Sequence, residues 1–319
     1  MMGFRSLRRV ALHGAVLLIA ACAGISANAG KQASSHAISG AEVLRLTQEY
    51  VKVAPKRYVG SPGHAAAENF IKSHFQPEAA KGNFITDEFY ARTPISLMTM
   101  RNFIVKYPGK KDGVIVLASH YETNYWLKDV DYVGANDGAC TTALLIAIGQ
   151  YLREHPPQGY SVWLLFDDGE ESINEQWTDS DSLYGVRHIA AKWSADGTIG
   201  KIKAFIVADM IGWKSMNIDR EGNSTPWLLD LLAQAGKDTG HSNYLFKHSG
   251  PIDDDHLPFK QRGVPVLDVI AYEYGTYDAK RGDYSYHHTP QDTLDKLSAQ
   301  SLQVSADLFV DLLRLIDQH

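Results

Sequence analysis

The sequence has 319 residues and a net charge of −6, with 45% apolar and 21% charged residues. These proportions exclude a mainly disordered, collagen-like or coiled-coil chain. No run of Lys or Arg stands out after residue 31, so the sequence predicts no nucleic-acid partner. Two cysteines are too few for a disulfide scaffold or a Cys-rich zinc site.

The first 29 residues have the pattern of a secretory signal peptide. Three arginines precede the apolar run Val10–Ala21, which is short for a membrane span. Two processing sites compete: Ala27-Asn28-Ala29 is an A-x-A site, whereas residues 19–22 resemble a bacterial lipoprotein box that would place a lipid on Cys22. We therefore expect an exported chain, periplasmic or extracellular. The mature chain then has no membrane span, and a lipid anchor at Cys22 is the alternative to simple cleavage.

Residues 30–40 are polar and predict a flexible lead-in to one domain, residues 41–319. In this domain, apolar residues at helical spacing alternate with short apolar runs that are typical of buried strands. We predict helices over 41–54, 64–75, 141–152, 183–193, 227–235 and 293–316. We predict two strands around Pro94 within 84–108, and further strands over 114–119, 161–166, 202–208 and 264–270. This alternation predicts a single-domain α/β/α sandwich with a central mixed, mostly parallel twisted sheet flanked by helices.

Polar clusters follow three of the predicted strands. His120 follows strand 114–119, residues 167–171 follow strand 161–166, and Asp209 follows strand 202–208. Ligand sites in open α/β sheets gather outside the carboxyl ends of the strands. The sequence therefore directs several carboxylates and one imidazole to a single crevice, where a bound cation would offset their mutual repulsion.

Five segments carry the candidate chemistry: 119–122, 134–139, 167–171, 208–212 and 287–289. Their carboxylates and imidazoles are ligands that suit zinc, and a catalytic zinc takes three protein ligands and leaves one position open. Of two adjacent glutamates such as Glu170 and Glu171, one can bind the metal while the other stays free as an acid or base.

In this order the segments resemble the M28 zinc-peptidase superfamily, and within it the glutaminyl-peptide cyclotransferases (glutaminyl cyclases). The subfamily signal lies in Trp177 six residues after Glu171, in Asp181-Ser182-Leu183-Tyr184-Gly185-x-Arg187-His188, and in the block from Asp254 to Val266. The resemblance covers roughly residues 40–318. It implies a zinc aminopeptidase-like fold, one zinc ion per chain, and conversion of the N-terminal Gln of peptides or proteins to pyroglutamate with loss of ammonia. We also expect a monomer.

The resemblance assigns roles to individual residues by position. The zinc ligands would be Asp137, Glu171 and His288. The catalytic residues would be Glu170 as proton shuttle, with Asp209 and Asp254 in a hydrogen-bond network behind it. The aromatic wall of the substrate pocket would include Trp177.

Three positions depart from the family pattern. His287 stands where cyclases of the animal type have Trp, so one wall of the pocket is either altered or supplied by the Tyr-rich loop 272–286. Glu122 stands where many superfamily peptidases have the Asp that orients His120, which weakens the case for a second metal. The run Asp253–Asp255 leaves the register of the catalytic Asp open by one position.

Two rival hypotheses remain open from the sequence. In a two-zinc aminopeptidase of the same superfamily, His120 and Asp209 would bind a second zinc, Asp137 would bridge the two ions, and Glu170 would activate water. In the cyclase interpretation, His120 instead supports the site from behind. A catalytically silent binding module is the other rival, although every ligand that the family pattern requires is present. For loop 272–286, a peptide-facing lid and a surface loop that packs on itself are both open.

Overall fold

A computed structural model of the chain describes residues 36–319. The predicted signal peptide, the lipidation candidate Cys22 and the first part of the predicted lead-in lie outside these residues. No helix of the described part is long and apolar enough to cross a membrane.

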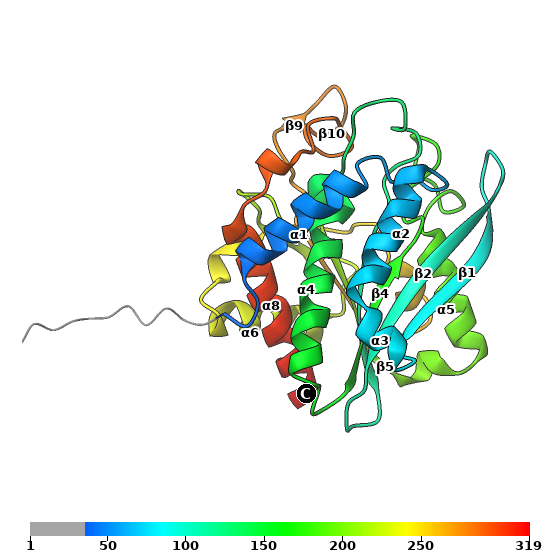
Figure 1. The fold of residues 1–319 in the computed structure, drawn as a ribbon. Coiled ribbons are helices and arrows are strands. Elements are labelled where there is room, and N and C mark those ends of the chain that lie inside the picture. Colours follow the sequence, from blue (N-terminus) through cyan, green and yellow to red (C-terminus); the bar gives the residue numbers. More distant parts are fainter. Residues whose placement is uncertain (1–35) are drawn as a thin grey trace, which may run out of the picture. The chain divides into compact units, whose positions relative to one another are not determined.

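Six strands form the central sheet in the order β1–β2–β4–β3–β5–β8. Figure 1 labels β1, β2, β4 and β5 of this sheet. They are β1 (Phe84–Arg92), β2 (Leu97–Tyr107), β3 (Val114–His120), β4 (Ser161–Asp167), β5 (Ile202–Asp209) and β8 (Val266–Ile270). The pairs β4/β3, β3/β5 and β5/β8 are parallel, whereas β1/β2 and β2/β4 are antiparallel. The prediction of a mixed, mostly parallel sheet is confirmed. Because the four parallel strands point the same way, their carboxyl ends meet at one edge.

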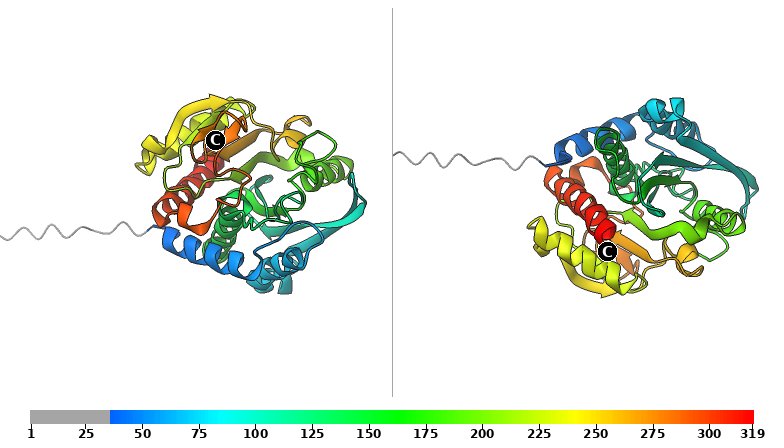
Figure 2. Two further views of the ribbon diagram at one scale, coloured as in Figure 1. Left: turned by 90° about the horizontal axis from the view of Figure 1, so that it is seen from above. Right: turned by 90° about the horizontal axis from the view of Figure 1, so that it is seen from below.

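Helices cover both faces of the sheet (Figure 2). They are α1 (Gly40–Val53), α2 (Pro62–His74), α3 (Gln76–Ala80), α4 (Cys140–Glu154), α5 (Tyr184–Ala195), α6 (Pro226–Asp238), α7 (Leu257–Lys260) and α8 (Ala299–Gln318). Side chains of α1, α4, α6 and α8 form the larger core on one face, and those of α5 and α7 form a smaller core on the other. In β3, Leu117 belongs to the larger core and Val116 to the smaller one, because successive side chains of a strand point to opposite faces.

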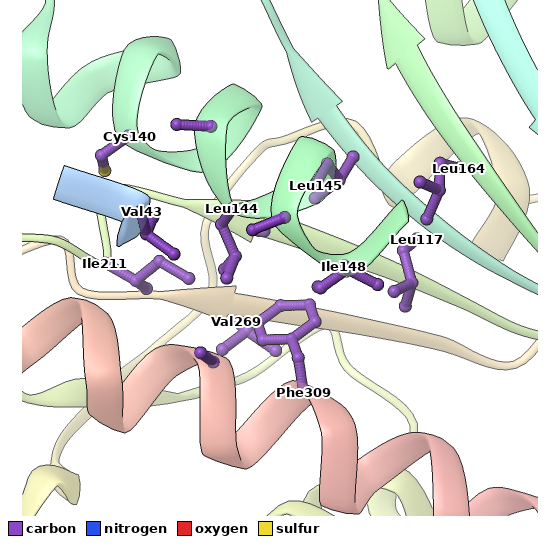
Figure 3. Packing of buried hydrophobic residues seen from close by; sticks show 14 of the residues in the cluster. Val43, Leu117, Cys140, Leu144, Leu145, Ile148, Leu164, Ile211, Val269 and Phe309 are labelled. Carbon is purple, nitrogen blue, oxygen red and sulfur yellow. The ribbon is translucent and has the colours of Figure 1, made fainter. Parts of the chain in front are cut away.

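The larger core is closed by α8 (Figure 3). Phe309 of α8 is 1% exposed and lies close to Val269 of β8 and Ile148 of α4. This contact joins the last helix of the chain to the sheet and to the helix that begins directly after the Asp137 turn.

The C-terminal helix differs from the prediction over 293–316. Residues Leu294–Lys296 form a short 3₁₀ turn, and α8 begins only at Ala299. The reason is local: the hydroxyl of Ser298 accepts a hydrogen bond from the Ser301 N–H at 3.0 Å, which caps a new helix start.

Several short elements give no periodic signal in the sequence. They are the parallel pair β6 (Ile218–Glu221) and β7 (Leu245–Gly250), the hairpin β9 (Tyr277–Asp278) and β10 (Asp283–Tyr284), the helices α3 and α7, the kinked turn Ala135–Ala139, and the 3₁₀ turns Thr198–Lys201 and Ser242–Tyr244. Elements this short hold too few residues for a repeat of apolar positions to be recognised.

The packing of Phe309 in the larger core predicts that truncation of this side chain destabilises the protein. Phe309→Ala should lower the free energy of unfolding by about 3–5 kcal/mol, because it leaves a cavity between α8 and the sheet. Denaturant unfolding followed by circular dichroism measures the change. Gln300→Ala, at an exposed position of the same helix, is the control and should shift stability by no more than about 0.5 kcal/mol. Equal effects of the two substitutions would contradict this packing.

Candidate functional site

A cavity of about 500 Å³ opens at the carboxyl edge of the sheet. It brings together eight of the nine residues that the sequence singled out: Asp137, Glu170, Glu171, Trp177, Asp209, Asp254, His287 and His288. The ninth, His120, does not line the cavity. It is 3% exposed and lies behind Asp137 and Asp209.

Asp137 is presented by the sharp turn between β3 and α4. Its backbone leaves the helical region (φ −87°, ψ 99°), and Gly138 follows with φ 81°. Asp292 Oδ2 accepts the Asp137 N–H at 3.1 Å, and the Tyr132 hydroxyl donates to Asp137 Oδ2 at 2.6 Å. The turn thus holds both the backbone and the carboxylate of Asp137.

Glu171 and His288 meet Asp137 across the cavity floor. Nε2 of His288 lies 3.1 Å from Glu171 Oε1 and 3.3 Å from Asp137 Oδ2. The Glu171 N–H donates to Glu122 Oε1 at 3.1 Å, and the Asn124 amide donates to Glu171 Oε2. Glu171 Oε1 is buried and accepts no hydrogen bond from any residue that the structure describes. His288 has φ 50°, an uncommon backbone conformation for a residue with a side chain, and such positions cluster at functional sites.

These contacts fit a divalent cation such as zinc. Zinc bonds to His and carboxylate ligands are about 2.0–2.2 Å long, and tetrahedral geometry then places ligand atoms roughly 3.3 Å apart. The two separations around His288 match that spacing, and the orphaned Glu171 Oε1 would gain a partner. Asp137, Glu171 and His288 could hold the ion through these contacts, and Asp137, His287 and His288 also bring ligand atoms within 4.8 Å of one another.

His120 approaches the same carboxylates from the interior. Its Nε2 lies 3.1 Å from Asp137 Oδ1 and 3.5 Å from Asp209 Oδ1, and ligand atoms of these three residues lie within 4.8 Å of one another. Within residues 36–319 its Nδ1 has no hydrogen-bond partner, because Glu122 Oε1 lies 3.8 Å away. Burial alone would lower the pKa of His120, but the Asp137 and Asp209 carboxylates raise it well above its usual value.

Glu170 lines the same cavity and brings a carboxylate oxygen within 4.8 Å of ligand atoms of His120 and Glu122. Burial, then the neighbouring Glu171, raises the pKa of the Glu170 carboxyl well above its ordinary value. Burial and the Asp209 carboxylate raise the pKa of Asp254 to about 8. Of the three consecutive aspartates, Asp253 is exposed, Asp254 is buried and lines the cavity, and Asp255 is buried outside the lining. Asp254 is thus the buried member of the run that faces the cavity.

The tyrosines of the Tyr-rich loop 272–286 have different surroundings. Tyr272 and Tyr284 line the cavity, whereas Tyr277 is exposed. Tyr274 is fully buried, and its hydroxyl donates to Asp292 Oδ1 at 2.7 Å. His287 lines the cavity with its ring centroid 3.7 Å from that of His288. Its Nδ1 lies 2.8 Å from Asp283 Oδ2.

A family model for the peptidases of family M28 matches residues 102–313. The chain belongs to peptidase family M28. The glutaminyl-peptide cyclotransferase of Drosophila melanogaster is 27% identical over 83% of this chain and 79% of its own length. That of Boiga irregularis is 31% identical over 67% of both chains.

Solved structures agree with this assignment. The crystal structure of an Acidobacteriales bacterium glutaminyl cyclase is 64% identical, with a TM-score of 0.86 over 88% of this chain and 95% of that chain. A zinc-dependent exopeptidase from Parabacteroides distasonis is 19% identical, with a TM-score of 0.75 over 88% and 99%, and shares the fold.

The sequence pattern does not identify several residues that position the site of this M28 chain. Arg57 is fully buried and donates to four backbone carbonyls, those of Tyr121, Val133, Gly134 and Asp137. Asn136 accepts the Gly212 N–H at 2.8 Å and donates to the Met210 carbonyl at 3.0 Å, which ties the Asp137 turn to the end of β5. The sequence holds no signal for Arg57 or Asp292, because their partners are far away in the chain.

The close packing around the Asp137 turn predicts that a methyl group added at Gly138 weakens zinc binding. A Cβ at Gly138 would lie 2.8 Å from Cε1 of His120 and 3.1 Å from the Glu122 carbonyl oxygen. Gly138→Ala should therefore weaken zinc binding about 10–100-fold, in addition to a stability loss of about 1–3 kcal/mol from its positive φ. Chelator competition and thermal unfolding measure the two effects.

Gly197→Ala is the matched control. Gly197 also has φ 81°, but nothing lies within 4 Å of the added Cβ. It should lose stability and keep its zinc affinity. Equal zinc affinity in the two variants would contradict the proposed role of the turn.

Proposed function

We propose that this M28 chain is a zinc-dependent glutaminyl-peptide cyclotransferase, which converts the N-terminal Gln of peptides or proteins to pyroglutamate and releases ammonia. The observation that carries the proposal is the placement of Glu170. It is a carboxyl of raised pKa, directly beside the Asp137, Glu171 and His288 set and facing the same cavity. The named cyclotransferases and the glutaminyl cyclase of 64% identity support the same activity.

Zinc, when bound by Asp137, Glu171 and His288, supplies the positive charge that polarises the side-chain carbonyl of the substrate Gln. Glu170 takes a proton from the substrate α-amine and delivers it to the departing amide nitrogen. Burial beside Glu171 raises the pKa of Glu170 well above its ordinary value, so this carboxyl binds a proton more tightly than a free Glu, which suits a group that takes up a proton and passes it on. The nearby carboxyl groups of Asp254 and Asp209 raise the pKa of Glu170 further.

The nucleophile and the electrophile belong to the same substrate residue. The enzyme therefore mainly has to hold the conformer in which the α-amine faces the side-chain carbonyl. Trp177 and His287 line the cavity and provide flat walls for this task.

A two-zinc aminopeptidase is the second candidate function, and one observation favours it. His120, Asp137 and Asp209 bring ligand atoms within 4.8 Å of one another, as a second ion bridged by Asp137 would need. Against it, no carboxylate of the described residues lies within hydrogen-bond distance of His120 Nδ1 to orient the ring, because Glu122 Oε1, 3.8 Å away, accepts the Glu171 N–H instead. The cyclotransferase names of the relatives also disfavour hydrolysis.

We further propose that the chain is exported to the periplasm or the cell exterior and acts as a monomer. The arginines before Val10–Ala21 and the A-x-A site support export. Lipidation at Cys22 is the alternative to cleavage after Ala29.

Two peptides that differ only in their first residue, Gln or Leu, test the activity by mass spectrometry. We expect loss of ammonia from the Gln peptide alone, and a decrease of about 10²–10⁴-fold with Glu170→Gln, which removes the acid/base. Glu154→Gln, at an exposed site on α4, is the charge-matched control and should retain activity. Release of the first residue, above all Leu, would instead establish the aminopeptidase.

Metal analysis tests the number of ions. The native chain and His120→Ala should each bind one equivalent of zinc, and His288→Ala should bind none, because only His288 belongs to the proposed ligand set. Chelation should abolish activity, and added zinc should restore it. Two equivalents in the native chain that fall to one in His120→Ala would establish the two-metal site.

A further inference from the structure

The cavity extends well beyond the metal-binding set. Besides the ligands and Glu170, its lining includes Asp219 of β6, residues 248–250 of β7, and Tyr272, Glu273 and Tyr284 of the Tyr-rich loop. The proposed reaction uses only the Gln residue at the substrate N-terminus. The space along β6 and β7 is therefore available to the residues that follow it.

The lining of this cavity is strongly acidic. It contains nine carboxylates and three histidines, and no Lys or Arg. Five of the carboxylates belong to the proposed metal and catalytic set, which leaves four that the reaction does not use: Glu175, Asp219, Asp253 and Glu273. A cavity of one charge sign attracts ligands of the opposite sign.

Asp219 is the least exposed of these four. It is 4% exposed, and its Oδ2 accepts the Tyr272 N–H at 2.9 Å. No described residue donates a hydrogen bond to its Oδ1 or forms an ion pair with it, and the next side chain, Arg220, lies over the Phe246 ring. Burial, together with the nearby Glu273, raises the pKa of Asp219. A buried carboxylate at a cavity wall, with one oxygen that the protein leaves unpaired, can form an ion pair with a cationic group of a ligand.

Glu273 lies near Asp219 and is only partly compensated. Its Oε1 is 2.9 Å from Nδ1 of His248, whose side chain is 44% exposed. Tyr272 and Tyr284 line the cavity beside it. Aromatic rings next to carboxylates suit long basic side chains, because the rings pack against the aliphatic stem and the carboxylates bind the charged head.

We propose that Asp219 and Glu273 form a subsite for a Lys or Arg side chain in the first two residues after the N-terminal Gln. This inference rests on the proposed cyclotransferase function and names the class of peptide that the enzyme prefers. The negative charge of the cavity lining also disfavours Asp or Glu at those positions, because like charges would meet in a partly desolvated cavity.

The test compares peptides of equal shape and different charge. Arginine and its neutral analogue citrulline are placed second in one peptide pair and third in another, and ammonia release gives kcat/KM. We expect the arginine peptide to exceed its citrulline counterpart about tenfold in at least one pair, a ratio typical of a partly buried charge pair. The ratio should fall as salt is added.

Two variants then locate the preference. Asp219→Asn keeps an acceptor for the Tyr272 N–H, and Glu273→Gln keeps the length of the side chain, so each removes one charge. Each should reduce the arginine-to-citrulline ratio towards one, and circular dichroism checks folding. Asp278→Asn, in the same loop but outside the cavity lining, is the charge-matched control and should keep the native ratio.

The outcomes separate the two proposals. Cyclisation of all the Gln peptides at equal kcat/KM would overturn the basic subsite and leave the cyclotransferase function intact. A preference for arginine that persists in both variants would also overturn the assignment to Asp219 and Glu273. Absence of cyclisation from every peptide by the zinc-loaded native chain would instead overturn the proposed function itself.

Discussion

Burial of like charges at the carboxyl edge of the sheet is the constraint on which the rest of the structure depends. Glu170, Glu171 and Asp209 lie within one cavity wall, next to Asp137 and Asp254. Carboxylates in such surroundings are unfavourable unless a proton, a donor or a cation compensates them. The protein uses all three means. Protons are retained at raised pKa, as at Asp254, backbone and amide donors bind Asp137 and Glu171, and the His288 contacts leave a position suited to zinc.

The loops that carry these carboxylates are held by buried polar groups rather than by apolar packing. Arg57 donates to four carbonyls around the Asp137 turn, and Asp292 accepts the N–H groups of both Asn136 and Asp137. A buried charge with several hydrogen bonds has few alternative arrangements, because any displacement leaves unsatisfied groups. The ligand positions are thereby fixed relative to the sheet.

The cavity has two sides with different electrostatic character. At the metal-binding side, His120, His288 and neighbouring hydrogen-bond donors compensate the negative charge of the carboxylates. Along β6 and the Tyr-rich loop, Asp219 accepts the Tyr272 N–H, Glu273 lies beside the exposed His248 and the Tyr284 hydroxyl, and no described Lys or Arg lines this part of the cavity. The reaction and the recognition of the peptide can thus take place in one continuous cavity. On the metal-binding side the protein itself compensates the carboxylate charges, and on the other side a basic residue of the peptide would do so.

The sequence predicted the strands of the central sheet, most helices and eight of the residues that line the cavity, several of these eight through resemblance to the family rather than through the pattern alone. Apolar runs and helical spacing report burial, and the ends of parallel strands necessarily share an edge, so segments such as 167–171 could be assigned to one crevice. Only the tertiary structure decided that Asp254 faces the cavity while Asp255 does not, and that Tyr274 supports Asp292 while Tyr272 lines the pocket. It also decided the roles of Arg57 and Asp219. Those roles depend on contacts between residues far apart in the chain and on the direction of each side chain in irregular loops, where no periodicity exists to reveal it.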